Sequence, residues 1–378
     1  MNNKKFKTGL VIGKFYPPHK GHKYLIESAL AQCDQVTVIV CDKADQLIPG
    51  TLRAQWLKEI HPTAIIMRID DTLNEDDTAA WAENTIKWLG SAPDAVFSSE
   101  NYGPGYAKAM GSKHIMVDQL RQTIPISGTK VRANPFANWD YLEPPVRAYF
   151  TKRICVLGAE STGTTTLSKA LAEHYKTVWV PEYGRLFSEG RIFNQDQNWN
   201  TPEFTHIAEI QATMEDALAR LSNKIEICDT DPFATTLWHM RYMDNARADK
   251  VEAIANSRHY DLYILTGDEI PFVQDGLRDG EHIRHWMHNL FEEELQRTGR
   301  PYLLVRGNKE QRLNLAITAI DALFTNPSTK PGFTFFSGIQ CQLNFSYQYA
   351  KKLTSANTGQ LRITNFYQQL HQRQWTRI

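Results

Sequence analysis

Short apolar runs alternate with longer amphipathic segments along most of this chain. In the first 132 residues, apolar runs typical of β-strands cover residues 10–12, 36–41, 64–69, 95–99 and 114–117. The amphipathic segments between them, typical of helices, cover residues 20–32, 51–60, 78–89 and 106–110. This alternation predicts right-handed crossovers and a parallel sheet with helices on its faces. Ligands of such sheets bind beyond the carboxyl ends of the strands.

A second alternating series begins at Arg153, after a segment rich in proline and aromatic residues (134–145) that we interpret as a packed connector. Its expected strands cover residues 153–158, 178–180, 225–228, 262–265 and 302–305, with helical patterns at 202–221 and 282–297. We therefore expect an α/β protein with two doubly wound parallel-sheet domains, at residues 1–150 and 151–326. A basic, aromatic tail follows at 327–378. We favour packing of this tail on the chain or on an oligomer neighbour over contact with RNA.

Composition narrows the class of protein. The 378 residues contain 42 Lys and Arg against 42 Asp and Glu, which argues against a general nucleic-acid binder or a membrane-surface protein. The five cysteines are widely spaced and mostly lie in apolar runs, so we expect reduced core residues of a cytoplasmic protein. No Cys/His spacing suggests a structural metal, and no segment reads as a signal peptide or membrane span.

The first candidate site is the stretch Gly-Lys-Phe-Tyr-Pro-Pro-His-Lys-Gly-His at residues 13–22. It joins an apolar strand to an amphipathic helix and places His19 and His22 on one face of the first helical turn. Free backbone N–H groups and the helix dipole favour anions there. Ordinary surface histidines are the alternative, but the strand, the Pro-Pro turn and the glycine make it the weaker one.

A second stretch, Ile-Ser-Gly-Thr-Lys-Val-Arg at 126–132, supplies hydroxyls and cations at a turn into another helix. Together the two stretches resemble the nucleotidyltransferase superfamily. In that family, the H-x-G-H and I-S-x-T-x-x-R motifs flank the ATP phosphates, and no covalent enzyme intermediate forms.

The second domain carries a loop of the form G-x-x-x-x-G between a strand and a helix, the context in which such a loop cradles phosphates. The residues of this P-loop are Gly158, Ala159, Glu160, Ser161, Thr162, Gly163, Thr164, Thr165 and Thr166. Thr164 occupies the position of the usual lysine, whereas Thr165 falls where the Mg-binding hydroxyl belongs. Because one phosphate donor is commonly worth about 100-fold in rate, another cation would have to substitute.

Charged residues that could complete this site follow other expected strands. Arg278, in a glycine-flanked loop placed like a kinase lid, is our first choice for the substituting cation, and Arg284 is the second. Asp229 and Asp231 follow a strand and suit Mg²⁺ binding or proton transfer, although a single acid there is more often a helix cap. Glu182, Tyr183, Arg185 and Asp275 complete the candidate substrate and lid residues.

With both halves in view, the chain resembles the bifunctional nicotinamide-mononucleotide adenylyltransferase and ribosylnicotinamide kinase family, the NadR type. The resemblance rests on the order H-x-G-H, I-S-G-T-K-V-R, N-P-F-x-x-W-x-Y, P-P-V-R, P-loop, E-Y-G-R, D-T-D and D-G-L-R. It implies that ATP and nicotinamide mononucleotide give NAD and pyrophosphate in the first domain. It also implies ATP-dependent phosphorylation of nicotinamide riboside in the second. No DNA-binding segment precedes the first strand, so we expect no DNA contact, and a homo-oligomer is possible.

The resemblance also implies roles for individual residues. It places His19, His22, Lys14 and Arg132 at the adenylyl-transfer centre, and Asp229 and Asp231 at the kinase centre. The other implied positions are Gly13, Phe15, Ser127 and Thr129 around ATP. From their own positions in the sequence, Arg53 and Trp56 are candidates for the nicotinamide nucleotide pocket, and Thr165 and Asp229 are candidates for binding Mg²⁺.

Other interpretations stay open at this point. The second domain could bind nucleotide as a sensor without kinase activity, which would leave a single-function adenylyltransferase. A transferase of the same superfamily could use phosphopantetheine or a cytidylyl substrate instead. A class I aminoacyl-tRNA synthetase is disfavoured, because the chain has no K-M-S-K-S-like loop.

Overall fold

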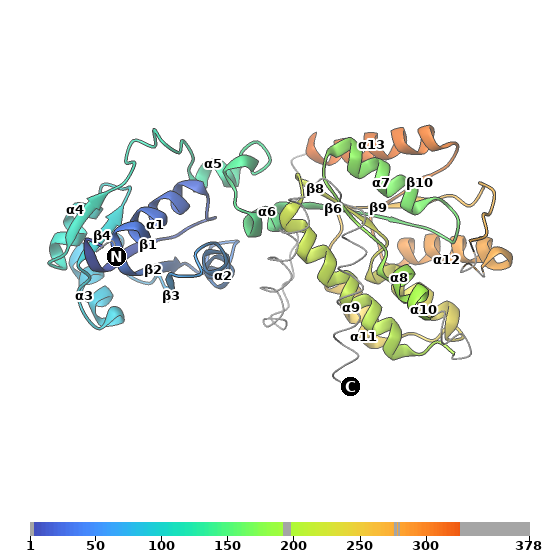
Figure 1. Ribbon diagram of the computed structural model, residues 1–378, viewed down its shortest axis with the longest axis horizontal. Helices are drawn as coiled ribbons and strands as arrows, with labels where there is room; N and C mark the ends of the chain where they lie inside the picture. Colours follow the sequence, from blue (N-terminus) through green and yellow to red (C-terminus); the bar gives the residue numbers. More distant parts are fainter. Residues whose placement is uncertain (1–3, 192–197, 276–277, 279, 326–378) are drawn as a thin grey trace. The chain divides into compact units, whose positions relative to one another are not determined.

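The computed structural model describes residues 4–191, 198–275, 278 and 280–325. The chain divides into two compact units between Phe150 and Thr151, and each contains one parallel sheet (Figure 1). The predicted fold class, two doubly wound α/β units, is confirmed. The predicted tail at 327–378 lies outside the described residues.

The first unit is built around five parallel strands in the order β3-β2-β1-β4-β5. The strands are β1 (Phe6–Gly13), β2 (Cys33–Asp42), β3 (Ile65–Asp70), β4 (Ala95–Ser98) and β5 (Lys113–Met116). The helices are α1 (Lys20–Gln32), α2 (Gly50–Ile60), α3 (Thr78–Leu89), α4 (Gly103–Ala109), α5 (Gly128–Ala133) and α6 (Pro144–Phe150), with a 3₁₀ turn η1 (Trp139–Tyr141). The strand order reverses at β1, so the loop after β1 lies at the switch point where ligands of such sheets bind.

Apolar side chains on both faces of this sheet explain the layers. Leu25, Ile26 and Ala29 of α1 and Leu57 of α2 pack on one face, and residues of α3 and α4 pack on the other. The aromatic connector is packed, as predicted, because Trp139 is buried in a cluster with residues of α2, α5 and α6.

The second unit has the strand order β10-β9-β6-β8-β7, again parallel throughout. The strands are β6 (Lys152–Leu157), β7 (Val178–Val180), β8 (Ile225–Asp229), β9 (Leu262–Thr266) and β10 (Tyr302–Val305). The helical elements are α7 (Thr164–Tyr175), α8 (Tyr183–Gly190), α9 (Thr201–Leu218), η3 (Ala219–Leu221), α10 (Pro232–Tyr242), α11 (Asp249–Asn256), η4 (Glu281–Ile283), α12 (Arg284–Arg297) and α13 (Lys309–Thr325).

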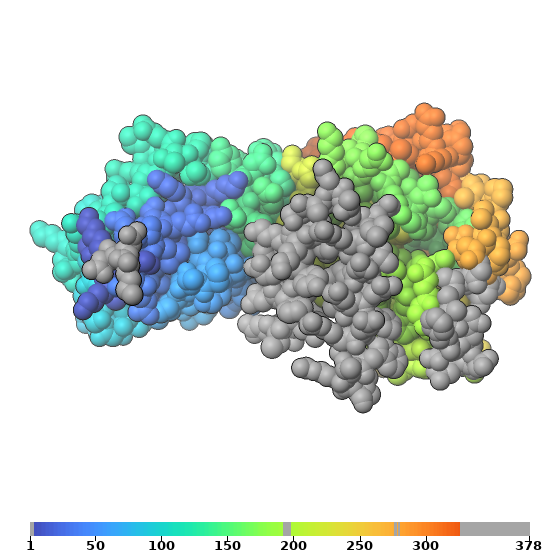
Figure 2. Space-filling model, viewed as in Figure 1, coloured from blue at the N-terminus to red at the C-terminus, as the bar shows by residue number. Residues whose placement is uncertain are grey.

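In this unit α7 and α13 cover one face of the sheet, and α8 to α12 cover the other (Figure 1). The outer side of α13 forms part of the molecular surface (Figure 2). The four cysteines within the described residues, Cys33, Cys41, Cys155 and Cys228, are buried and unpaired, which agrees with their predicted role in the core. None of the helices in the described ranges is long and apolar enough to cross a membrane.

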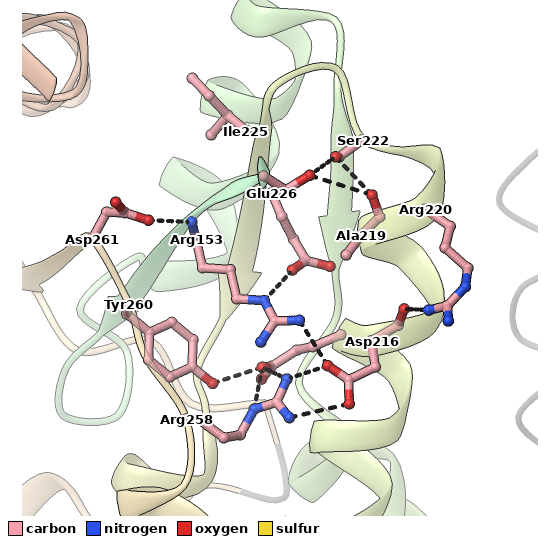
Figure 3. A network of polar contacts seen from close by, with 12 residues as sticks. Arg153, Asp216, Ala219, Arg220, Ser222, Ile225, Glu226, Arg258, Tyr260 and Asp261 are labelled. Atoms are coloured by element: carbon pink, nitrogen blue, oxygen red, sulfur yellow. Dashed lines mark hydrogen bonds and ion pairs between the residues drawn. The ribbon is translucent and has the colours of Figure 1, made fainter. Parts of the chain in front are cut away.

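A network of largely buried charged side chains joins β6, α9, β8 and Arg258, which follows α11, in the second unit (Figure 3). Arg153 Nε donates to Glu226 Oε2 at 3.1 Å and Arg153 Nη2 donates to Asp216 Oδ1 at 2.7 Å. Arg258 Nη2 donates to Glu215 Oε2 at 2.8 Å and to Asp216 at 2.9 Å. Two guanidinium groups thus face three carboxyl groups. Burial, which outweighs the attraction of Arg153, raises the pKa of Glu226 to about 8, so that a proton on Glu226 balances the network.

The network makes stability depend on pH. A folded-state pKa of about 8 lies above the ordinary glutamate value of about 4.3. The resulting stabilisation is therefore complete below about pH 4 and is lost as the pH rises toward about 8, on the order of 1 kcal/mol per pH unit. We expect Glu226→Gln, which cannot lose the proton, to show a flatter dependence of unfolding free energy on pH in urea titrations. Glu209→Gln, which alters an exposed glutamate on α9, is the matched control, and parallel curves for the two variants would contradict this assignment.

Candidate functional site

The first candidate site is the loop between β1 and α1. His19 is the N-cap of α1, where its Nδ1 accepts a hydrogen bond from the His22 backbone N–H at 3.3 Å. The two imidazoles stack with their centroids 3.7 Å apart, and the Phe15 ring meets His22 edge-on at 5.0 Å. The turn therefore brings both histidines of the predicted motif together at the carboxyl end of β1.

Burial keeps both imidazoles neutral. It lowers the pKa of His19 to about 4, with a smaller contribution from Arg121, and lowers the pKa of His22 well below 6.5, with contributions from His19 and Arg121. Within the described residues, His22 Nδ1 is buried without a hydrogen-bond partner. Because an unsatisfied buried polar atom is costly, this nitrogen is suited to a ligand such as a phosphate oxygen.

Helix α5 closes the same site. Ser127 is its N-cap and accepts from the Lys130 backbone N–H at 3.3 Å, which leaves the hydroxyl hydrogen available for another acceptor. Arg132 Nη1 donates to the Tyr16 carbonyl at 2.5 Å, and its guanidinium lies over the Tyr16 ring at 4.5 Å. A Cβ at Gly128 would lie 2.5 Å from the same carbonyl, so only glycine permits this close approach. The two predicted motifs thus meet although more than 100 residues separate them.

The remaining predicted residues of this unit have mixed positions. Gly13 ends β1, and Thr129 accepts from Arg132 Nη2 at 3.2 Å. Lys14 is exposed at the loop and forms an ion pair with Glu75 at 2.9 Å.

Arg53 and Trp56 lie in the framework beneath the loop. Arg53 is completely buried, donates to the backbone carbonyls of Lys14 and Cys41, and pairs with Asp42 at 2.7 Å. Trp56 is buried and meets the Tyr149 ring edge-on. These contacts do not support the predicted place of Arg53 and Trp56 in a nicotinamide pocket, because both side chains are buried and contact other residues of the protein.

The second candidate site is the P-loop between β6 and α7. Gly163, at φ 85°, is the N-cap of α7, and Ser161 also has a positive φ. A Cβ at Gly158 would lie 2.2 Å from Thr266 Oγ1, so β9 and the loop approach closely there. Thr162 Oγ1 donates to the Ala159 carbonyl at 2.7 Å, which fixes the inner turn. The loop can thus present its backbone N–H groups to an anion, as the spacing predicted.

Asp229, at the end of β8, is the acid of this site whose surroundings best suit a metal ligand. Burial raises its pKa to about 6, although the hydroxyls of Thr165 and Thr164 beside it lower the pKa. Its Oδ1 is buried without a hydrogen-bond partner among the described residues. No group of three or more His, Cys, Asp or Glu residues in the described ranges could hold a metal by itself. Asp229 and Thr165 therefore fit a Mg²⁺ ion that takes its other ligands from phosphate and water.

Asp231 has a different role from Asp229. It is the N-cap of α10, accepting from the Ala234 backbone N–H at 2.9 Å and from the Tyr263 hydroxyl at 2.9 Å. Both carboxyl oxygens are thus used within the core. Because both oxygens already accept hydrogen bonds, neither is left for a ligand at the P-loop. The helix cap, which was the alternative given for these acids, describes Asp231 better.

Three arginines hold the P-loop from outside. Arg284 Nη2 donates to the Ser161 carbonyl at 3.0 Å, Arg278 Nη1 donates to Ser161 Oγ at 3.4 Å, and Arg312 Nη1 donates to the Thr162 carbonyl at 2.7 Å. The first two are the predicted cations. Arg312 was missed. The signal that could have indicated Arg312 is its position on the buried face of α13, four residues before Ala316 and eight before Ile320.

Two acidic residues connect the lid segment to the rest of the site through hydrogen bonds and ion pairs. Glu160 accepts from the Gly280 backbone N–H at 2.8 Å and pairs with Arg241 at 3.1 Å. Asp275 pairs with Arg185 of α8 at 2.8 Å and with Arg278 at 3.3 Å. The predicted lid residues are thus in contact with the P-loop and α8.

The predicted substrate residues Glu182 and Tyr183 lie where β7 leads into α8. Burial and the neighbouring Asp229 raise the pKa of Glu182 to about 8, against the effect of Arg185. Glu182 is therefore a protonated carboxyl group at neutral pH and can donate a hydrogen bond. The Tyr183 side chain is buried, and its hydroxyl lies 3.2 Å from His206 Nε2.

Fold and sites together define a two-part protein that joins a nucleotidyltransferase-like unit to a P-loop kinase-like unit. A family profile described as an AAA domain matches residues 153–312. The Escherichia coli K12 protein named "Trifunctional NAD biosynthesis/regulator protein NadR" is 30% identical over 315 residues, covering 76% of each chain. The chain belongs to the NadR family.

Solved structures agree on the fold. A crystal structure of a NadR protein in complex with NR superposes with a TM-score of 0.70 at 20% identity, covering 88% of this chain and 99% of that chain. A NadR protein in complex with NAD and AMP-PNP superposes with a TM-score of 0.66 at 19% identity, covering 87% and 99%. The resemblance to this family that the motifs indicated is confirmed.

Proposed function

We propose that the chain makes NAD, and that its first unit transfers AMP from ATP to nicotinamide mononucleotide. Membership of the NadR family supports this function. The single observation that carries it is the buried His22 ring at the carboxyl end of β1, which stacks on His19 and whose Nδ1 has no hydrogen-bond partner among the described residues. Arg132 and Ser127 bring positive charge and a donor to the same loop.

In the proposed reaction a phosphate oxygen of nicotinamide mononucleotide attacks the α-phosphorus of ATP. The new P–O bond completes NAD, and the bond between the α- and β-phosphates breaks to release pyrophosphate. The attacking phosphate is already ionised, so no base is required. His19, His22 and Arg132 would act by aligning the phosphates and by stabilising the charge that builds up on the leaving group.

We propose that the second unit phosphorylates nicotinamide riboside with ATP. The riboside hydroxyl attacks the γ-phosphorus, the bond from that phosphorus to the β-γ bridging oxygen breaks so that ADP leaves, and the hydroxyl proton passes to water. Thr165 and Asp229 would hold Mg²⁺, which would supply charge neutralisation on the phosphates when bound. Glu182 and Arg185 would bind the hydroxyls of the sugar.

Arg278 is the proposed substitute for the missing P-loop lysine, since its guanidinium already reaches Ser161 Oγ. We expect Arg278→Ala to lower the rate of riboside phosphorylation about 100-fold. Adding Thr164→Lys to that variant is expected to restore part of the rate, because a lysine there returns a cation to the phosphates. The measurement is ADP release with nicotinamide riboside, with adenylyl transfer by the same variants as the control. Full kinase activity in Arg278→Ala would exclude this role.

The first-unit activity is tested by incubating the protein with Mg-ATP and nicotinamide mononucleotide and resolving the products by chromatography. The proposal predicts NAD and pyrophosphate in equal amounts. A folded protein that makes no NAD but adenylylates phosphopantetheine, or transfers a cytidylyl group, would contradict it. We also propose that the enzyme acts in the cytoplasm, a location supported by its buried, unpaired cysteines.

A further inference from the structure

A cavity of about 490 Å³ lies in the second unit, between α10, α11 and α12. Its lining includes Phe233 and Thr236 of α10, Ala255 and Asn256 of α11, and Thr298 and Arg300 after α12. None of the lining residues belongs to the P-loop or to the lid segment, and Asp229 is not among them. The volume is within the range of small-molecule sites, roughly 300–1,000 Å³. The nucleotide sites do not account for this cavity.

Four of the charged lining residues neutralise one another. Arg247 and Arg297 both donate to Glu294, at 2.8 Å and 2.6 Å. Arg247 also donates to Glu252 at 2.8 Å. These two guanidinium groups and two carboxylates form a closed set with no net charge, so they fix one wall of the cavity.

Arg300 is the remaining charge on the lining. Its guanidinium lies over the Phe233 ring at 4.5 Å and donates to Asn256 Oδ1 at 3.2 Å and to the Tyr263 hydroxyl at 3.4 Å. Its Nε is buried and has no hydrogen-bond partner among the described residues. Asp231, the carboxylate that it influences, is separated from it by the Tyr263 hydroxyl. The lining of the cavity thus carries one net positive charge, on Arg300.

We propose that this cavity binds a small organic carboxylate. The carboxylate would pair with the Arg300 guanidinium, since a guanidinium fork matches two carboxylate oxygens. A single negative charge suits the lining, because Arg300 leaves it with one net positive charge.

The site is tested with benzoate as the probe and benzamide as its neutral counterpart, by titration calorimetry on the full chain. Benzoate is expected to bind with a Kd on the order of 1 mM, and benzamide at least about ten-fold more weakly, because charge pairing with Arg300 supplies the difference. Arg300→Gln is expected to weaken benzoate binding at least about ten-fold. No heat from benzoate at concentrations of about 20 mM, or equal binding of benzamide, would overturn the proposal.

Asn256→Asp keeps the test valid if Arg300→Gln fails to fold. The substitution leaves the side-chain shape unchanged and gives Arg300 a permanent carboxylate partner, so the folded variant is expected to lose benzoate binding. Lys250→Gln removes a positive charge from the exposed side of the same helix and is expected to bind like the wild type. Wild-type affinity in Asn256→Asp, or displacement of benzoate by equimolar inorganic phosphate, would overturn the assignment of a monoanionic carboxylate site.

Discussion

The His22→Ala variant is expected to lose about 100-fold or more in kcat for adenylyl transfer. The imidazole lies beside His19 in a buried turn, and its Nδ1 has no partner within the described residues. In the proposed complex this nitrogen contacts the phosphates of ATP, so its removal withdraws a pre-positioned donor from the charge that builds up in the reaction. The measurement is the steady-state rate of NAD formation from ATP and nicotinamide mononucleotide.

A second buried histidine of the same unit provides the control for this variant. His61 is also buried, and its Nε2 has no partner in the described part of the chain, but it lies at the C-terminal end of α2. We expect His61→Ala to retain most of the adenylyl-transfer rate as long as it folds. Riboside phosphorylation in His22→Ala should also stay near the wild-type rate, because that reaction belongs to the other unit. Equal losses in the two histidine variants would mean that His22 acts through stability alone.

Asp229→Asn is expected to lower riboside phosphorylation about 100-fold or more. The carboxylate ends β8 beside the P-loop hydroxyls, and one of its oxygens has no hydrogen-bond partner in the described part of the chain, which together fit a metal ligand. An amide in its place removes the negative charge that would hold Mg²⁺. The rate is measured as ADP release at several Mg²⁺ concentrations, and a raised Mg²⁺ requirement is expected.

Asp231→Asn separates the metal-ligand role from a general effect of losing an acid at this sheet edge. Asparagine caps helices about as well as aspartate, so we expect a loss of less than about ten-fold in this variant. Adenylyl transfer should stay within about a factor of two in both variants, because that reaction belongs to the other unit and shares no residue with this site. A larger loss in Asp231→Asn than in Asp229→Asn would reverse the roles that we assign.

Residues whose function depends on nearby sequence could be predicted from the chain alone. The apolar runs gave the strands, and His19 and Ser127 were recognised because a strand, a turn and a helix start within a few residues of each other. The glycines and hydroxyls of the P-loop were found in the same way. In each case the spacing along the chain determines the geometry, since the atoms involved lie within one or two turns.

The roles of residues whose contact partners lie far away along the chain could not be predicted from the sequence. Arg53 and Arg312 are buried only because backbone carbonyls and carboxylates from other elements surround them, and the Thr162 carbonyl lies 150 residues before Arg312. Glu226 follows the same rule, because the partner that sets its role comes from β6. The sequence indicated acids and arginines near a sheet edge. Only the packing decides which of them have an atom left for a ligand.

The most direct test of the account is to supply the protein with Mg-ATP and nicotinamide riboside as the only nicotinamide compound. We predict that ADP and nicotinamide mononucleotide appear first and that NAD and pyrophosphate follow, because both units act in turn. His22→Ala should stop the sequence at the mononucleotide, and Asp229→Asn should prevent it from starting. If the riboside stays unchanged while added mononucleotide is converted to NAD, the second unit is not a kinase. If neither compound yields NAD, the proposed function is wrong.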